Sequence, residues 1–180
     1  MQLEEKTLQQ DYRYRGKIVN LRVDNARLPD GSEALREVIE HPGGVCVAAL
    51  TEEDELLFVR QYRYPYGEVV CELPAGKLDG KGEDPLSAAC RELREETGAT
   101  AENIVSLGEL YPTPGYCDEI IRLYFATGLH FGEAQPDADE FLEVERIPLS
   151  EAVRLVMDGT LKDAKTQTAI LKVWYIRSST

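Results

Sequence analysis

Residues 76–99, GKLDGKGEDPLSAACRELREETGA, decide the fold because they combine a glycine-rich loop with a short capped helix. We expect the helix to begin after Asp84, whose side chain can cap it, with Pro85 at its first position, and to end at Gly98. One stripe of the helix is predicted to pack on a β-sheet. This stripe consists of Leu86, Cys90, Leu93 and Thr97.

Three glutamates lie close together on this helix. Glu92 and Glu96 are one turn apart and share a face, with Glu95 beside them. Like charges at this spacing repel, and a packed helix holds them at the edge of the core. A bound divalent cation would relieve the repulsion, whereas a solvated charged face is the plainer alternative for a helix rich in Glu and Arg.

The order of residues around the helix resembles the signature box of the Nudix hydrolases. That box runs Gly, five residues, Glu, seven residues, Arg-Glu-aliphatic-x-Glu-Glu-x-Gly-aliphatic. Its second half is matched by Arg91, Glu92, Leu93, Glu95, Glu96, Gly98 and Ala99. One departure is that six residues separate Gly76 from Glu83. Because Glu83 keeps its spacing to Arg91, we expect the loop at residues 80–82 to absorb the extra residue.

The resemblance implies a divalent-cation site built from carboxylates. Glu92 and Glu96 match the principal metal ligands, Glu95 matches a third acid at the same centre, and Ala75 matches a position that offers its backbone carbonyl. Arg91 matches a residue that orients the acids by ion pairing, so Arg91 and Glu95 are the first catalytic candidates. Hard oxygen ligands beside a phosphate-bearing substrate favour Mg²⁺, with Mn²⁺ as the usual substitute.

Composition limits the other classes of function. A chain of 180 residues with 43% hydrophobic content predicts one compact domain with a small appendage. The net charge of -13 argues against nucleic acid or an anionic membrane as a partner. No long apolar run or signal peptide is recognisable, so a cytoplasmic protein is expected. Scattered histidines and widely spaced cysteines predict reduced thiols and no zinc site.

Strand and helix patterns predict an α/β fold. Segments near residues 12–17, 20–28 and 34–41 are predicted to form an N-terminal β appendage. The later strands are expected at 45–50, 55–64, 68–73, 105–111, 120–127 and 141–147, and two further helices at 149–158 and 163–176. This order favours a mixed sheet covered on both faces, which agrees with the Nudix α/β/α sandwich. We divide the chain into the appendage at 1–42 and a Nudix hydrolase domain at 43–180.

Stretches outside the box resemble the ADP-ribose pyrophosphatases, a subgroup of the family. RQYR-like and ELPAGK-like stretches of that subgroup match residues 60–63 and 72–77. Pro114 lies sixteen positions after Gly98, a spacing that marks the same subgroup, although a Pro-Gly pair alone is only a turn signal. The resemblance therefore implies Mg²⁺-dependent hydrolysis of ADP-ribose to AMP and ribose 5-phosphate, and it assigns Pro114 to the substrate site.

An acidic protein that binds an anionic diphosphate needs a local cluster of positive charge. Alternation along the strand places Arg60 and Arg63 on opposite faces. The resemblance favours Arg63 for phosphate, with Glu72 as its support. Arg36 and Glu37 match positions that hold the adenosine end, and a pair on the strand surface is the plainer alternative.

The loop at residues 128–140 is expected to supply one further acid. In the resembled subgroup such a loop closes over the diphosphate, where an acid assists a water as general base or completes the metal shell. Glu140 is the best match and Asp139 the second, against the alternative of a solvated acidic loop. The resemblance also implies a homodimer in which the N-terminal strands help to build the partner's adenosine pocket.

Two other functions remain open from the sequence. One is hydrolysis of another nucleoside diphosphate derivative, such as a sugar nucleotide, a dinucleoside polyphosphate or a damaged nucleotide. The other is a non-catalytic module that senses ADP-ribose. The intact set of Arg91 and three box glutamates favours an enzyme over a sensor.

Overall fold

The computed structural model describes residues 3–80, 82–136 and 140–179. The chain forms two compact units. The first contains Met1–Gly43 together with Tyr111–Ile120, and the second contains Gly44–Leu110 and Ile121–Thr180. The inclusion of Tyr111–Ile120 in the first unit had no counterpart in the sequence pattern.

The first unit is built on a three-stranded antiparallel sheet. Its strands are β1 (Lys6–Arg15), β2 (Asn20–Arg27) and β3 (Glu33–Glu40), in the order β1-β2-β3. The segment Tyr111–Ile120 lies beside the end of β3, because the Ile39 N–H donates to the Tyr116 carbonyl at 2.7 Å. The Asp118 N–H in turn donates to the Ile39 carbonyl at 3.0 Å.

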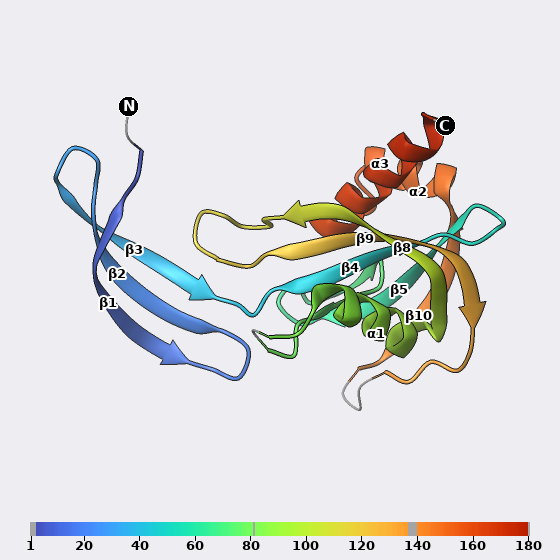
Figure 1. Ribbon diagram of the computed structural model, residues 1–180, viewed down its shortest axis with the longest axis horizontal. Helices are drawn as coiled ribbons and strands as arrows, with labels where there is room; N and C mark the ends of the chain where they lie inside the picture. Colours follow the sequence, from blue (N-terminus) through green and yellow to red (C-terminus); the bar gives the residue numbers. More distant parts are fainter. Residues whose placement is uncertain (1–2, 81, 137–139, 180) are drawn as a thin grey trace. The chain divides into compact units, whose positions relative to one another are not determined.

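The second unit contains two sheets and all three helices (Figure 1). Its strands are β4 (Gly44–Ala49), β5 (Glu55–Arg63), β6 (Glu68–Glu72), β7 (Ala75–Lys77), β8 (Ala99–Leu110), β9 (Ile121–Phe131) and β10 (Leu142–Pro148). The helices are α1 (Pro85–Thr97), α2 (Leu149–Met157) and α3 (Ala164–Ser178). One sheet has the order β7-β4-β9-β8, with β4 parallel to β9, and the other is antiparallel with the order β10-β5-β6.

Alternation along β4 divides the core of this unit into two layers. Alternate residues point to opposite faces of a sheet, so a strand that is buried throughout packs on both sides. Val45, Val47 and Ala49 join a cluster that includes Ala88, Ala89 and Leu93 of α1. Cys46, Ala48 and Leu50 join a second cluster with Ala152 of α2 and Ile170 and Val173 of α3. Helices therefore cover both sides of β4, and the predicted α/β sandwich is confirmed.

The predicted boundaries of α1 are confirmed, but its predicted buried stripe is partly wrong. Asp84 accepts a hydrogen bond from the Ser87 N–H, Pro85 begins the helix, and Gly98 ends it in the left-handed conformation with φ of 71°. The buried residues are Ala88, Ala89, Glu92, Leu93, Glu96 and Thr97. Leu86 and Cys90 are exposed instead. Small alanines let the helix approach the sheet closely, so the face that carries two glutamates is the one that packs.

The two strands that come directly after α1, β8 and β9, are longer than the sequence predicted. β8 begins directly after Gly98 and pairs with β9 from Ala99 opposite Phe131 onward. Residues 128–131, which we expected in a loop, are therefore the end of β9. The short strand β7 was not predicted, because three residues carry no periodicity and its pairing with β4 is non-local. In the part of the chain that the structure describes, no helix has the length and apolarity needed to cross a membrane.

Leu93→Ala should lower the free energy of unfolding by about 2–5 kcal/mol, because truncating a buried leucine leaves a cavity in the core. Leu93 has no exposed surface, whereas Leu86 on the same helix is 43% exposed. Urea denaturation followed by circular dichroism measures both variants. Leu86→Ala is the matched control and should change stability by roughly 0.5 kcal/mol or less. Equal losses for the two variants would contradict the buried face of α1.

Candidate functional site

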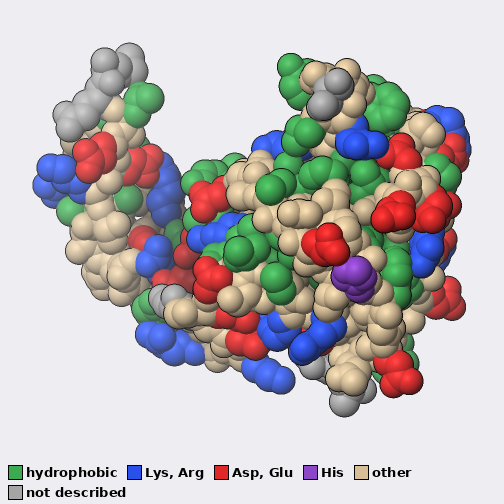
Figure 2. All heavy atoms as spheres, turned by 45° about the vertical axis from the view of Figure 1, so that its right-hand side comes forward, with side chains coloured by type: hydrophobic (Ala, Val, Ile, Leu, Met, Phe, Trp, Pro, Cys, Tyr) green, Lys and Arg blue, Asp and Glu red, His purple; other side chains and the backbone are tan. Residues whose placement is uncertain are grey.

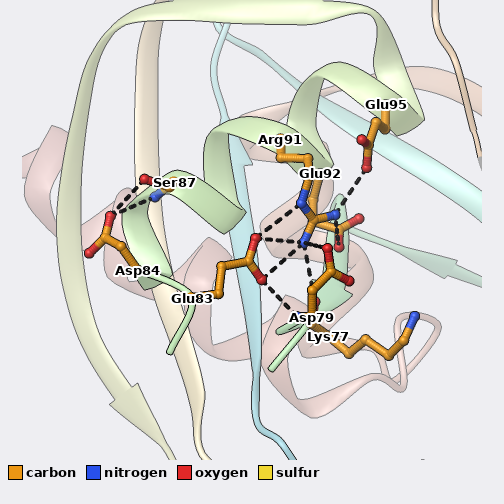
Figure 3. A network of polar contacts seen from close by, with 8 residues as sticks. All are labelled: Lys77, Asp79, Glu83, Asp84, Ser87, Arg91, Glu92 and Glu95. Atoms are coloured by element: carbon orange, nitrogen blue, oxygen red, sulfur yellow. Dashed lines mark hydrogen bonds and ion pairs between the residues drawn. The ribbon is translucent and has the colours of Figure 1, made fainter. Parts of the chain in front are cut away.

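Arg91 lies at the centre of the acidic residues of the box (Figure 3). Its Nη1 donates to Glu92 Oε1 at 2.8 Å and to Glu95 Oε2 at 3.0 Å. Its Nε donates to Glu83 Oε1 at 3.1 Å. Asp79 Oδ2 also lies 3.8 Å from Nη2, so four carboxylates from α1 and the preceding loop share one guanidinium.

Glu83 belongs to this cluster despite the extra residue before it. The Asp79 N–H donates to Glu83 Oε2 at 2.7 Å, and this bond together with Arg91 lowers the pKa of Glu83. Both contacts hold Glu83 in the relation to α1 that its seven-residue spacing predicts. The additional length therefore falls upstream in the loop, where a side chain at Gly80 or Gly82 would meet open space. Lys81 lies outside the described residues.

Glu96 is the most deeply buried acid of the box, with 3% of its surface exposed. Burial raises its pKa to about 8, although the Ala75 N–H donates to Oε2 at 2.9 Å and opposes this change. Burial also raises the pKa of Glu92, against the opposing effect of Arg91. Glu140 adds negative potential at both carboxylates and contributes to the rise of both pKa values. Asp139 lies outside the described residues.

Gly76 lies directly against the Glu92 carboxylate. A Cβ atom at this position would overlap the Glu92 carboxylate. Gly76 pairs with Val45 in β7, and the preceding Ala75 supplies the N–H that binds Glu96. A larger residue at the first glycine of the box would therefore displace the Glu92 carboxylate from its present position, and a ligand role for the Ala75 carbonyl stays a prediction.

Arg63 and Glu72 form a second charged group in the same unit. Arg63 Nε donates to Glu72 Oε1 at 2.5 Å and its Nη2 donates to Oε2 at 2.9 Å. This bidentate pairing matches the supporting role expected of Glu72. Arg60 pairs with Glu145 instead, which confirms that the two arginines point to opposite faces of β5.

Lys165, at the start of α3, was missed by the sequence analysis. Its ammonium donates to Glu72 Oε2 and lies 3.0 Å from Asp163 Oδ2. The sequence offered only a polar start to a predicted helix, 93 positions away from Glu72 along the chain. No local pattern connects residues at that separation.

The residues proposed for the adenosine end belong to the first unit. Arg36 Nε and Nη2 donate to the two oxygens of Glu5 at 2.9 Å and 2.7 Å. Glu37 is its neighbour on β3 and points to the opposite face of the sheet. Pro114 lies in the segment that accompanies β3. The structure thus gathers the box acids and the Arg63 group in one unit, and Arg36, Glu37 and Pro114 in the other.

Comparison with known proteins identifies the family. Residues 40–168 match the NUDIX domain, and residues 5–39 match the nucleoside diphosphate sugar hydrolase N-terminal domain. The chain belongs to the Nudix family. The Nudix resemblance drawn from the box is therefore confirmed.

Two curated relatives are similar along nearly the whole chain. An ADP-ribose pyrophosphatase of Bacillus subtilis (strain 168) is 42% identical over 93% of this chain and 91% of its own. A methanol dehydrogenase activator of Bacillus methanolicus is 43% identical over the same shares. A crystal structure of an ADP compounds hydrolase shares the fold, with a TM-score of 0.86 and 22% identity, and covers 99% of this chain and 97% of its own.

Nudix hydrolases generally need a divalent cation, and the box carboxylates fit one in their chemistry. Glu92 and Glu96 are buried oxygen donors whose pKa values are raised, chiefly because burial disfavours their charged form. Within residues 3–80, 82–136 and 140–179, however, no group of three or more His, Cys, Asp or Glu side chains is already gathered for a metal. Arg91 holds Glu92 and Glu95, while Glu96 binds the Ala75 N–H.

The raised pKa of Glu96 predicts a pH-dependent stability in the absence of divalent cations. Between its ordinary value of 4.5 and about 8, the folded protein retains a proton that the unfolded chain has released. The free energy of unfolding should therefore fall as pH rises through this window. Glu96→Gln stays neutral, so its stability relative to the wild type should increase with pH.

Urea denaturation in EDTA, at about pH 5 and about pH 8, measures this difference. Glu53→Gln changes an exposed carboxylate in the turn between β4 and β5, outside the acidic box, and is the control. Its stability relative to the wild type should stay the same at both pH values. A constant difference for Glu96→Gln would contradict the burial of a charged carboxylate at this position.

Proposed function

We propose that this Nudix protein hydrolyses the diphosphate of ADP-ribose to AMP and ribose 5-phosphate, with Mg²⁺ as its cation and Mn²⁺ as a substitute. The observation that carries the proposal is the combination of an intact acidic box with Arg63, which buried Glu72 fixes in the same unit. The similarity to an ADP-ribose pyrophosphatase along nearly the whole chain supports this substrate over other diphosphates.

In this proposal the box acids hold the cation and Arg91 orients them. Glu92 and Glu96 are the principal ligands, with Glu95 and the carbonyl of Ala75 completing the set. The bound cation neutralises the diphosphate and lowers the pKa of water at the site.

A loop acid moves the proton of the attacking water. Glu140 is its first acceptor, because its charge already acts on Glu92 and Glu96. Asp139 is the second candidate. The water oxygen forms a bond to one phosphorus, and the bond from that phosphorus to the bridging oxygen breaks. Positive groups around the leaving phosphate stabilise the charge that develops there.

The remaining substrate contacts are assigned by the same proposal. Arg63 binds phosphate, Arg36 and Glu37 bind the adenosine end, and Pro114 helps to shape the substrate site. A small-molecule substrate also suits the mixed surface charge, because Lys and Arg side chains lie among Asp and Glu on the face shown in Figure 2. Four free cysteines suit a reducing compartment such as the cytoplasm.

We also propose a homodimer in which the N-terminal strands contribute to the partner's adenosine pocket. A small sheet gains stability from a hydrophobic face or from packing on another element, and the first unit leaves large apolar side chains exposed. Tyr14 is 61% exposed and Leu35 is 69% exposed. A second copy of the chain would cover this surface.

Glu96→Gln should lower the rate of ADP-ribose hydrolysis by at least about 10²-fold, because it removes a buried charge that the cation needs at the reacting centre. AMP release is measured by chromatography at saturating Mg²⁺, and circular dichroism verifies the fold. Glu102→Gln changes an exposed glutamate that pairs with His130 on β9 and should keep wild-type activity. Activity retained in Glu96→Gln would remove the proposed metal site.

A panel of nucleoside diphosphate derivatives should give the highest kcat/KM for ADP-ribose. Sugar nucleotides, dinucleoside polyphosphates and oxidised nucleotides are the competitors, and their products are separated by chromatography. A higher kcat/KM for one of these compounds would reassign the substrate within the same chemistry. Binding of ADP-ribose without any Mg²⁺-dependent cleavage would instead indicate a sensing module.

A further inference from the structure

The first turn of α3 holds the end of β6 in place. Asp163 caps this helix by accepting from the Thr166 N–H at 2.9 Å. Buried Thr166 then accepts from the Leu73 N–H through its Oγ1, also at 2.9 Å. Lys165 donates to the preceding residue, Glu72. Two consecutive residues next to the loop of the acidic box are thus bound by side chains of one helical turn.

Glu72 is shared between two cations. Its side chain is only 2% exposed, and it accepts from Arg63 on one side and from Lys165 on the other. Lys165 is itself 11% exposed and also lies 3.0 Å from Asp163, so its ammonium faces two carboxylates and little solvent. The four groups together carry no net charge, which is the arrangement that a buried ionic cluster needs.

Arg63 is the most exposed member of this group, at 36% of its side chain. If Glu72 were bound by Arg63 alone, one buried negative charge would neutralise Arg63, the more exposed of the two cations in this group. Lys165 supplies a second positive charge to Glu72 from the first turn of α3. Arg63 can therefore keep its orientation through Glu72 and still present positive potential to an anion.

We propose that Lys165 is a positioning residue for the diphosphate, acting through Glu72 on Arg63. The inference rests on the proposed function, because Arg63 is the phosphate-binding residue there. Lys165 neither reaches the substrate nor takes part in the bond-breaking step. Its contribution is to keep Glu72 from neutralising Arg63 and to hold both side chains against α3.

A double-mutant cycle between Lys165 and Glu72 tests this route. Lys165→Met should raise KM for ADP-ribose about tenfold with kcat changed less than about twofold, because a charge-assisted contact behind a ground-state ligand is lost. In the Glu72→Gln background, Arg63 and Lys165 no longer contact a common carboxylate. There Lys165→Met should change KM by less than about twofold. Lys172→Met is the matched control, since Lys172 is on the same helix and binds the carbonyl of Leu107. It should keep wild-type kinetics.

Two kinetic results for Lys165→Met would overturn the proposal. A tenfold rise in KM in both backgrounds would mean that Lys165 acts independently of Glu72, and an unchanged KM in Lys165→Met would mean that it has no such role. Thermal unfolding separates loss of fold from loss of affinity. If Lys165→Met does not fold, Lys165→Gln keeps a donor without the charge and should still raise KM at least about threefold. An unchanged KM in that variant would also reject the role.

A binding measurement separates this proposal from the proposed function. Titration with inorganic pyrophosphate in the absence of divalent cations, followed through the NMR signal of the Arg63 Nε–H, requires no turnover. Lys165→Met should need about tenfold more pyrophosphate to shift this signal, and Lys172→Met should not differ from the wild type. If the wild type fails to cleave ADP-ribose, the substrate assignment falls while this titration still decides the role of Lys165. If wild type and Lys165→Met need the same concentration of pyrophosphate to shift the signal, the positioning role of Lys165 is rejected.

Discussion

The packing of acidic side chains between α1 and the sheet is the constraint on which the rest of this structure depends. Glu92 and Glu96 lie on the face of α1 that is buried, beside the alanines and Leu93 that attach the helix to the core. Burial of carboxylates is unfavourable unless they are paired or coordinated. The core of the second unit therefore holds two carboxyl groups close together, and Gly76 leaves the space that the end of the Glu92 side chain occupies.

Buried carboxylates lie both at Glu72 and in the box, but their charges are balanced differently. Around Glu72 the charges are equal in number, with Arg63 and Lys165 facing Glu72 and Asp163. In the box a single arginine contacts three glutamates, and the fourth, Glu96, receives only a backbone N–H among the hydrogen bonds that the structure describes for it. The balanced group around Glu72 is suited to fix the positions of its side chains. The box, with its excess of acidic side chains, is suited to bind a cation.

Features of the fold and the site that depend on residues close together in the sequence could be predicted, whereas features that depend on distant residues could not. The caps of α1, the spacing of its glutamates and the alternation of Arg60 and Arg63 are local, and the sequence predicted each of them. The exposed positions of Leu86 and Cys90 were predicted wrongly, because apolar spacing was given more weight than the alanines that let the helix pack closely. Lys165, β7 and the placement of Tyr111–Ile120 depend on contacts between distant parts of the chain, which no local pattern records.

Because the segment Tyr111–Ile120 belongs to the first unit, this unit cannot be separated from the second by a single cut in the chain. It connects β8 to β9, two paired strands of the second unit, yet its backbone is bonded to Ile39 in the first. The polypeptide therefore passes between the units at three points, and cutting it after Gly43 would leave the excised N-terminal strands without a segment that belongs to them. An exchange of this unit between relatives would have to carry the β8–β9 connection with it, so the two pieces form a single module that is discontinuous in sequence.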